Sequence, residues 1–324
     1  MSPLEKYIDS KPQSRGNMGM YCQDIVEMFE ILEHLTPEPI PMLMQFGDMK
    51  HSHDFGFVNI PHFKKFRSAT DKLATVVSDG CLSSPRPTLP SAHSSQMQPI
   101  IWKLATHRHF KHLPNVNKDD TPWALKKDMA IFRGQLTGAL EYFDKSISAQ
   151  ENCDNMIRCH LVQKYANSTL VDAKLTTTRN RLPNTLGGVE LVAPKVPIKY
   201  MMQHKALVML EGNDVASGLK WALLSQSVVL MSKPQHTSWA MEELLEPWVH
   251  YIPLNDRATD VEEKMQWIIQ HDAQAQRIAQ RGSLWMEDLL YHPDAARDER
   301  HVKEEMIRRY RAHFVRHATT TTTS

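Results

Sequence analysis

Apolar positions along the chain follow two periods, and the first third of the chain carries one clear example of each. Residues 22–35 have apolar side chains at helical spacing, and the prolines that follow end the pattern, which predicts a helix. Residues 41–46 form a compact apolar run that Gly47-Asp48 ends, as a buried parallel strand would. Asp48 would then lie at the carboxyl edge of a strand, either as a cap or turn residue or as a functional carboxylate.

Beyond residue 122 the pattern becomes regular, because short apolar runs alternate with segments of helical spacing such as residues 155–166. Helical patterns continue over residues 261–280 and 283–290, with Arg281-Gly282 between them. Strands that alternate with helices are typical of a parallel, doubly wound sheet whose ligand crevice lies at the strand ends. The expected strands are 130–132, 168–175, 206–210, 227–231 and 248–254.

Changes in composition indicate where one domain ends and the next begins. A polar connector precedes Pro122-Trp123, so we expect a first domain over residues 1–121 and a second over residues 122–292. The basic helical pattern over residues 293–318 predicts a helix that packs back across the first domain, or else a solvated amphipathic helix. The threonine-rich tail, residues 319–324, is expected to be disordered.

Charge and cysteine content narrow the class of protein. The 324 residues include 38 basic and 37 acidic side chains, so neither a nucleic acid nor an anionic membrane surface is favoured as the main partner. No stretch approaches the ~20 apolar residues of a transmembrane helix, and the amino terminus lacks the apolar core of a signal peptide. Cys153 and Cys159 lack the spacing of a zinc knuckle, and we expect them to be free or singly paired thiols.

Two histidine clusters and one basic cluster are weaker candidates for function. His51 and His53, and a second group around His109, could suggest a metal, but no cysteine or glutamate completes a ligand set nearby. A metal hydrolase is therefore only a remote alternative. The basic residues within 64–67 are expected on a solvated helix face.

The segment 129–138 carries the strongest signal for binding. Its apolar run ends in Arg133-Gly134, and Gln135 and Leu136 lead on to Thr137-Gly138. This pattern predicts a buried strand that runs into a tight loop, where glycine allows close approach and exposed N–H groups can bind phosphate. The alternative is an ordinary turn after a strand.

Other polar residues of the second half are expected at the same crevice. Arg158 lies early in the next helix and would either face a diphosphate or form a surface salt bridge. Glu242 and Glu243 could accept hydrogen bonds from sugar hydroxyls, although paired glutamates on a helix are usually solvated. The candidate donor-binding residues are Gly134, Gln135, Thr137, Gly138, Arg158, Gly212, Asn213, Ser217, Lys220 and Glu243.

Six motifs follow one another in an order that resembles glycosyltransferase family 90, the capsule-associated group similar to protein O-glucosyltransferases and lipopolysaccharide-modifying enzymes. The resemblance runs from about residue 99 to residue 254, and Trp-Val-His-Tyr-Ile-Pro at 248–253 is its most specific part. The motifs are Pro122-Trp123 with Lys126, Phe132-Arg133-Gly134 with Thr137-Gly138, Leu170-Val171-Asp172-Ala173, Leu210-Glu211-Gly212-Asn213, Leu219-Lys220 and Pro247 to Leu254.

This resemblance implies a GT-B fold, in which two Rossmann-like domains with parallel sheets face a cleft. The second domain would hold a UDP-sugar, typically UDP-glucose or UDP-xylose, and transfer would invert the anomeric centre without a metal or other cofactor. The acceptor would be a hydroxyl group of a protein or a glycan. Asp48 matches the position of the family's catalytic base, and Thr137 and Arg158 match its diphosphate contacts.

Two departures from the family pattern leave a second interpretation open. Gly218 stands where many members have arginine, and Leu136 stands where protein O-glucosyltransferases have arginine. The alternative function is therefore a non-catalytic nucleotide-sugar or glycan binder with the same fold. Eukaryotic members of the family usually start with a signal peptide, so its absence here suggests either a truncated gene model or a cytosolic relative of the bacterial kind.

Overall fold

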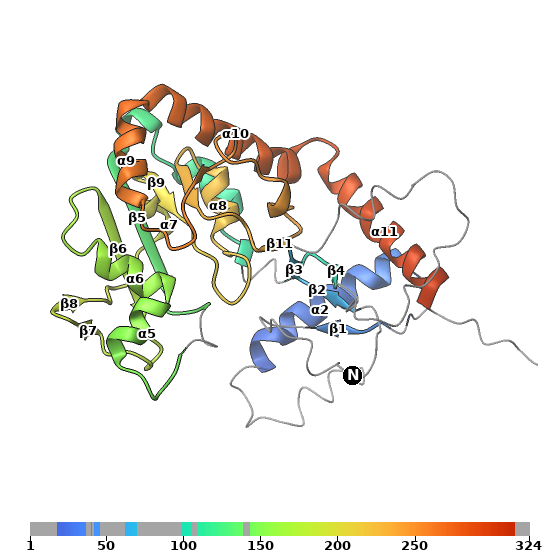
Figure 1. Cartoon of the computed structure of the whole chain (residues 1–324). Helices are drawn as coiled ribbons and strands as arrows, with labels where there is room; N and C mark the ends of the chain where they lie inside the picture. The colour runs from blue at the N-terminus through green and yellow to red at the C-terminus, as the bar shows by residue number, and fades with distance from the viewer. Residues whose placement is uncertain are drawn as a thin grey trace, which may run out of the picture.

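The computed structural model describes residues 18–36, 40, 42–45, 62–69, 99–104, 109–138 and 143–314 (Figure 1). Its main feature is a five-stranded parallel sheet in the order β12-β10-β9-β5-β6. The strands are β5 (Lys127–Gln135), β6 (Val171–Thr177), β9 (His204–Val208), β10 (Val228–Met231) and β12 (Ile252–Pro253). The parallel α/β architecture predicted for the second half is therefore confirmed.

The strand order determines where a ligand can bind. Numbered along the chain, the five strands lie in the order 2-1-3-4-5, and the order reverses between β5 and β9. In doubly wound sheets the ligand crevice lies at the carboxyl ends of the strands at this reversal. The loops that follow β5 and β9 therefore form the expected binding edge.

The strands in the middle of the sheet are apolar where they are buried, because both of their faces are covered. Ala130 and Phe132 of β5 belong to one buried cluster, whereas Ile131 between them belongs to the other. All four residues of β10 are buried. Strands covered by helices on both sides are expected to be apolar throughout.

Helices from different parts of the chain cover the two faces. Residues of α6 (Ile157–Lys164) and α9 (Val261–Gln270) pack in one cluster, and those of α8 (Leu219–Leu224) pack in the other. The predicted helix at 155–166 corresponds to α6. The remaining helices and strands here are α4 (Val116–Asp119), α5 (Ala149–Asn155), α7 (Ile198–Met201), α10 (Asp272–Tyr291), and the hairpin strands β7 (Thr185–Leu186) and β8 (Val189–Glu190).

Two predicted boundaries in the second half are wrong. The final strand is only Ile252–Pro253 rather than 248–254, because Trp248 adopts φ 64° and its N–H donates to the Tyr251 carbonyl at 2.7 Å, forming a turn. No break occurs at Arg281-Gly282, since α10 continues through it and the chain bends at His271 instead. Gly282 is needed for packing, because a Cβ there would lie 2.9 Å from the His250 carbonyl oxygen.

The first part of the chain contributes a smaller parallel sheet in the order β1-β2-β4. The predicted helix at 22–35 is confirmed, and the predicted strand at 41–46 is reduced to two residues. The elements are α2 (Met18–Leu35), β1 (Met44–Gln45), β2 (Phe63–Lys64), β3 (Phe66–Ser68) and β4 (Ile100–Ile101). The basic residues at 64–67 thus lie on and between short strands, not on a helix.

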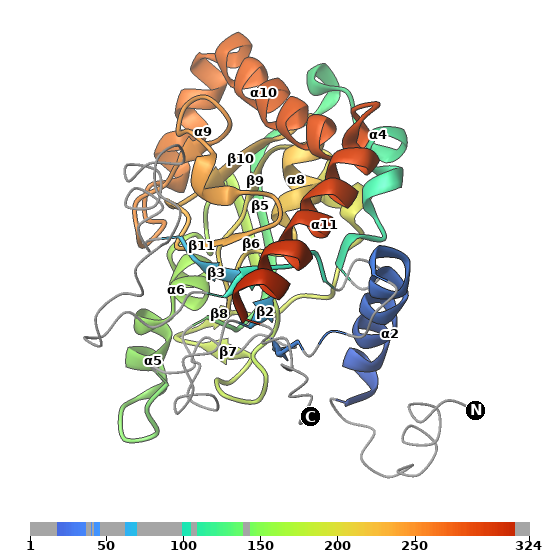
Figure 2. The ribbon, with the colours of Figure 1, turned by 90° about the vertical axis from the view of Figure 1, so that its right-hand side faces the viewer.

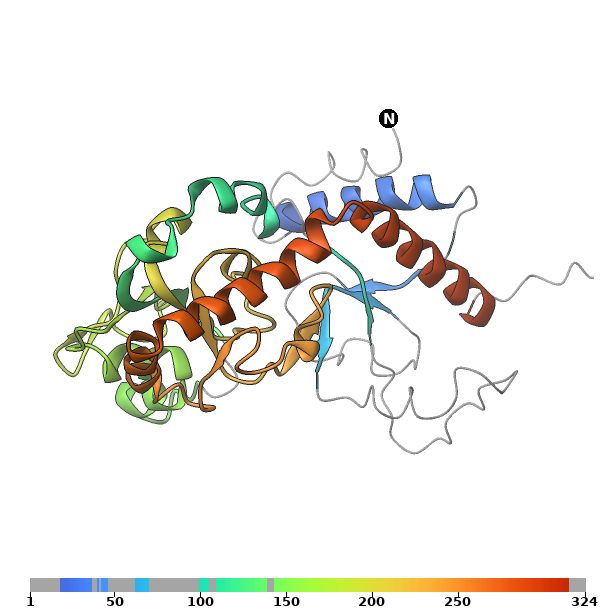
Figure 3. The same cartoon turned by 90° about the horizontal axis from the view of Figure 1, so that it is seen from above.

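The two parts of the chain are joined at two places. β3 pairs with β11 (His236–Ser238) in an antiparallel ladder. The last helix, α11 (Ala295–Phe314), extends away from α10 and lies against α2 and the smaller sheet (Figures 2 and 3). Its Ile307 and Tyr310 share a buried cluster with Met28, Phe63 and Trp102.

None of the described helices is long and apolar enough to cross a bilayer.

Candidate functional site

The loops after β5 and β9 touch each other at the point where the strand order reverses. The Gly138 N–H donates to Asn213 Oδ1 at 3.1 Å. Gly138 has φ 97°, a conformation that strongly favours glycine, and a Cβ there would lie 2.8 Å from the Gly212 carbonyl oxygen. We call this contact between the loops the junction.

The side chain of Arg158 connects the two loops of the junction through hydrogen bonds. Its Nη1 donates to the Gln135 carbonyl at 2.9 Å and to Thr137 Oγ1 at 2.7 Å, while its Nη2 donates to the Leu210 carbonyl at 2.6 Å. Burial lowers the pKa of Arg158 to about 10, although the charges of Asp214 and Glu211 act to raise it. The guanidinium is therefore charged at neutral pH, and it places a positive charge next to both loops.

Two glycines make room for this arginine. A Cβ at Gly212 would lie 2.7 Å from Thr137 Oγ1 and 3.0 Å from Arg158 Nη2. A Cβ at Gly134 would lie 2.9 Å from Cζ of Phe132 and 3.4 Å from Arg158 Nη1. The glycines of the sequence motifs are therefore explained by close packing around the half-buried guanidinium of Arg158 as well as by backbone conformation.

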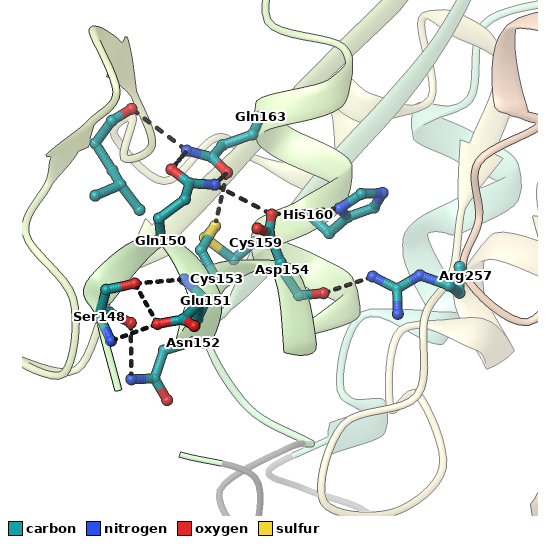
Figure 4. Close-up of a disulfide and its surroundings, with 11 residues drawn as sticks. Ser148, Gln150, Glu151, Asn152, Cys153, Asp154, Cys159, His160, Gln163 and Arg257 are labelled. Atoms are coloured by element: carbon teal, nitrogen blue, oxygen red, sulfur yellow. Dashed lines mark hydrogen bonds and ion pairs between the residues drawn. A yellow bond between two sulfur atoms is a disulfide. The ribbon is translucent and has the colours of Figure 1, made fainter. Parts of the chain in front are cut away.

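A disulfide holds the start of α6, the helix that carries Arg158. Cys153 of α5 and Cys159 of α6 are bonded to each other, with their Cα atoms 5.1 Å apart (Figure 4). Of the two alternatives expected from the sequence, free or paired, the structure has the paired one. Ser148 caps α5 through a capping box with Glu151, so both ends of this short helix are fixed.

A hollow of about 740 Å³ opens on one side of the junction, and we call it the large hollow. It is lined by the ends of β5, β6 and β9 and by the segment 195–198. Its charged residues are mostly basic, with one carboxylate among them. They are Lys65, Arg133, Arg158, Arg179, Lys195 and Asp214, with His109 and His112 also in the lining.

A second hollow of about 460 Å³, the small hollow, lies on the side of β10. It shares Gly212 and several apolar neighbours with the large hollow, so the loop after β9 forms the wall between the two. Glu211 in this wall accepts hydrogen bonds from the Gln235 and His236 N–H groups at 3.0 and 3.1 Å. Its carboxylate also lies 2.7 Å from His236 Nδ1, which fixes the far side of the small hollow.

Eight of the ten predicted donor-binding residues line these hollows. Gly134, Gln135, Thr137, Arg158, Asn213 and Ser217 line the large one, Gly138 lines the small one, and Gly212 lines both. The two that do not line either hollow are Lys220 and Glu243.

Lys220 is not placed beneath a phosphate as expected. Its side chain is 1% exposed and forms an ion pair with Glu242, which is also 1% exposed. Glu242 is therefore not a solvated glutamate, and it accepts a further hydrogen bond from the Ser238 N–H at 2.7 Å. Glu243 lies 3.6 Å from Arg67 Nη2, between the two parts of the chain.

Several residues of the site were missed by sequence reasoning. Arg179 and Lys195 occur in segments without an apolar pattern, so no local signal marked them. Lys65 was marked only as part of a basic cluster, and it forms an ion pair of 2.7 Å with Asp214 of the loop after β9. Only the tertiary structure brings these positions to one edge.

Some earlier predictions fall outside the described residues. Asp48, the predicted base, is outside them, as are His51, His53 and the threonine-rich tail at 319–324. In the part of the chain that the structure describes, no three His, Cys, Asp or Glu side chains cluster as metal ligands would.

Comparison with known proteins shows which family this chain resembles. The family described as Glycosyl transferase family 90 matches residues 105–295, which includes the whole five-stranded sheet. The chain is 27% identical over 187 residues to O-glucosyltransferase LpsA of Dichelobacter nodosus, covering 58% of this chain and 50% of that protein. It is 30% identical over 172 residues to human Protein O-glucosyltransferase 3, covering 52% and 29%, and 28% identical over 175 residues to human Protein O-glucosyltransferase 1, covering 53% and 40%.

The chain thus spans half or less of the length of these relatives. The matched region contains the junction, Arg158 and both hollows apart from Lys65. Since the family match covers more than half of the 324 residues, this chain belongs to glycosyltransferase family 90.

Proposed function

We propose that this protein transfers a sugar of the glucose or xylose class from a UDP-sugar to a hydroxyl group of a protein or glycan. The observation that carries the proposal is the junction. Two loops at the reversal of the strand order are held together by a half-buried arginine, between two hollows. Main-chain N–H groups, a threonine hydroxyl and a nearby positive charge are the groups that bind a diphosphate.

The two hollows suggest how the donor would lie. The nucleoside would enter the small hollow, the diphosphate would cross the junction near Thr137 and Asn213, and the sugar would reach the large hollow. Charge that develops on the leaving UDP would be stabilised by Arg158 and by the loop N–H groups, without a metal or cofactor. Lys220 has no part in this arrangement because it is paired with Glu242.

The proposed reaction is a direct displacement that inverts the anomeric centre. Asp48 would accept the proton of the acceptor hydroxyl, whose oxygen attacks the anomeric carbon from the face opposite UDP. The bond from the anomeric carbon to the phosphate oxygen breaks, and UDP leaves. A GT-B arrangement, with the first part of the chain closing over the second, would exclude water and suppress hydrolysis of the donor.

A non-catalytic binder of a nucleotide sugar or glycan is the second candidate, and Gly218 is the observation in its favour. A Cβ at this position would lie 3.1 Å from Trp221 Nε1 and 3.4 Å from Met209 Sδ. The wall of the large hollow is therefore closely packed at the position where many family members carry an arginine. A protein without that cation could retain the donor and lack turnover.

A screen of nucleotide sugars tests both candidates. UDP, UDP-glucose and UDP-xylose are expected to raise the unfolding temperature in a concentration-dependent way, since a ligand at 100 times its Kd stabilises by ~2.7 kcal/mol. ADP-glucose and GDP-mannose serve as controls for the nucleoside. An enzyme also releases UDP slowly from its donor, whereas a binder does not. Absence of any shift with UDP at millimolar concentrations would contradict both the transferase and a binder of nucleotide sugars.

Gly138→Ala tests the junction itself. The added methyl group meets the Gly212 carbonyl, and φ 97° is unfavourable for alanine, so the loops should separate. We expect UDP affinity to fall at least ~10-fold, which corresponds to ~1.4 kcal/mol, as measured by calorimetric titration.

Gly188→Ala is the matched control for this variant. Gly188 also has a positive φ, of 77°, but it lies in the β7–β8 hairpin with nothing within 4 Å of the added Cβ. Gly188→Ala therefore has the energetic cost of alanine at a positive φ, but no steric clash. If Gly138→Ala bound UDP as the unchanged protein does, the junction would not be part of the donor site.

A further inference from the structure

The basic residues of the large hollow fall into two groups that differ in whether a carboxylate offsets their charge. Arg133 forms an ion pair with Asp172 at 2.7 Å and Lys65 forms one with Asp214 at 2.7 Å, while the negative charges of Asp214 and Glu211 act on Arg158. Arg179 and Lys195 are exposed at the rim, and neither forms an ion pair with any carboxylate of the described residues. Within the described part of the chain, two cations without a carboxylate partner therefore line the same hollow.

The backbone holds Arg179 in a conformation that few residues adopt. Arg179 and Asn180 come just after the end of β6 and have φ of 54° and 57°, in the left-handed region. The Arg179 N–H donates to Thr177 Oγ1 at 3.0 Å, and the Arg181 N–H donates to the Thr178 carbonyl at 3.2 Å. Left-handed residues other than glycine persist only where surrounding contacts impose them, and they are concentrated at functional sites.

Lys195 is brought to the same edge by a different segment. Leu175 of β6 accepts a hydrogen bond from the Ala193 N–H at 2.9 Å and donates to the Leu191 carbonyl at 2.8 Å. The chain at 191–193 therefore runs parallel beside the carboxyl end of β6, with a bridge between Leu175 and Val192. Both cations thus lie beyond the carboxyl end of β6, at the edge of the sheet.

This edge is on the acceptor side of the proposed site. The small hollow lies on the β10 side of the junction, and β6 lies on the opposite side of β5. A donor that extends from the small hollow across the junction leaves the β6 side of the large hollow for the acceptor. Arg179 and Lys195 would therefore meet the acceptor, not the diphosphate.

We propose that Arg179 and Lys195 bind an anionic group, a carboxylate or a phosphate, on the sugar acceptor. The inference rests on the proposed function and goes beyond it by naming the chemical class of the acceptor. Cations without internal partners attract such groups through charge-assisted hydrogen bonds, and they offer no comparable gain to a neutral sugar.

The test measures acceptor binding to the protein saturated with UDP, so that the donor site is already filled. The probes are methyl β-glucoside, methyl β-glucuronide and methyl β-glucoside 6-phosphate, followed by ligand-observed nuclear magnetic resonance. We expect one or both anionic probes to bind about 10-fold more tightly than the neutral one, a difference of ~1.4 kcal/mol. This preference should decrease as salt screens the charges. The two anionic arms distinguish a carboxylate from a phosphate acceptor.

The double variant R179Q/K195Q should remove this preference. The control K145Q/K199Q loses the same charge at two exposed positions outside both hollows and should keep the preference. Equal binding of all three probes, or no binding of the anionic ones, would overturn the inference. A protein that fails to bind UDP at all would instead overturn the proposed function, and the inference with it.

Discussion

Lys220→Met is expected to lower the free energy of unfolding by ~3–5 kcal/mol, because it leaves a buried carboxylate without its counter-ion. Lys220 and Glu242 are each 1% exposed and are bonded to each other. Methionine fills a similar volume, so the loss is electrostatic more than steric. Chemical denaturation monitored by tryptophan fluorescence would measure it.

The double variant K220M/E242Q separates the ion pair from the packing of its members. Removing both charges leaves no ion buried, so most of the lost stability should return. The amide oxygen introduced by Glu242→Gln can still accept the hydrogen bond that the Ser238 N–H donates to the carboxylate. A Lys220→Met protein within ~0.5 kcal/mol of the unchanged one would refute the role given to the pair, since that is the range of ordinary surface substitutions.

The same pair predicts a dependence on pH. Burial acts to raise the pKa of Glu242, but the charge and hydrogen bond of Lys220 outweigh it, so the folded-state pKa lies below the ordinary value of 4.5. A carboxyl with a lowered pKa stabilises the fold above its unfolded pKa, and this contribution is lost as pH falls through the folded value. In Lys220→Met the carboxyl has no cation, so acid should lessen the defect of that variant.

Asp48→Asn is expected to reduce sugar transfer by ~10²–10⁴-fold, because an amide cannot accept the proton of the acceptor hydroxyl. UDP binding should survive, since the proposed donor site, with the junction and the small hollow, is built from residues 134–256. The comparison of kcat for transfer with the Kd for UDP measures both effects. This separation would distinguish a catalytic base from a residue that supports the fold.

Asp54→Asn is a suitable control for Asp48→Asn. It removes a carboxylate six positions along the same segment, and it should leave transfer within about twofold of the original rate. Full transfer activity in Asp48→Asn would remove Asp48 from the mechanism. The donor site argued from the junction would be untouched by that outcome.

Much of the large sheet could be predicted because its signal is local. The runs at 130–132 and 228–231 are apolar throughout, because helices cover both faces of the sheet, and a short run of this kind is typical of a buried parallel strand. The loop at Thr137-Gly138 was predicted for the same reason, as glycine and threonine directly after a buried strand specify a tight turn. These features depend on neighbours within a few residues.

The final strand and the last helices were harder to predict, because their local sequence signal was ambiguous. Residues 248–254 are apolar enough for a strand, yet the hydrogen bond between Trp248 and Tyr251 turns most of them away from the sheet. Gly282 looked like a helix end, but its lack of a side chain is what lets α10 pass the carbonyl of His250. In the first case a local turn overrode the strand pattern, and in the second a contact with another segment explains the glycine.

By itself the sequence determined the parallel α/β class, the position of the loop at Thr137-Gly138 and the family, because periodic apolar runs and short motifs specify these features. Only the tertiary structure decided that Arg158 braces two loops, that Lys220 is paired with Glu242, and that Arg179 and Lys195 reach one hollow. Which charged side chains form ion pairs, and which residues line a pocket, depends on distances between segments that are far apart in the chain. No local sequence pattern specifies such distances, because they are set only when the chain folds.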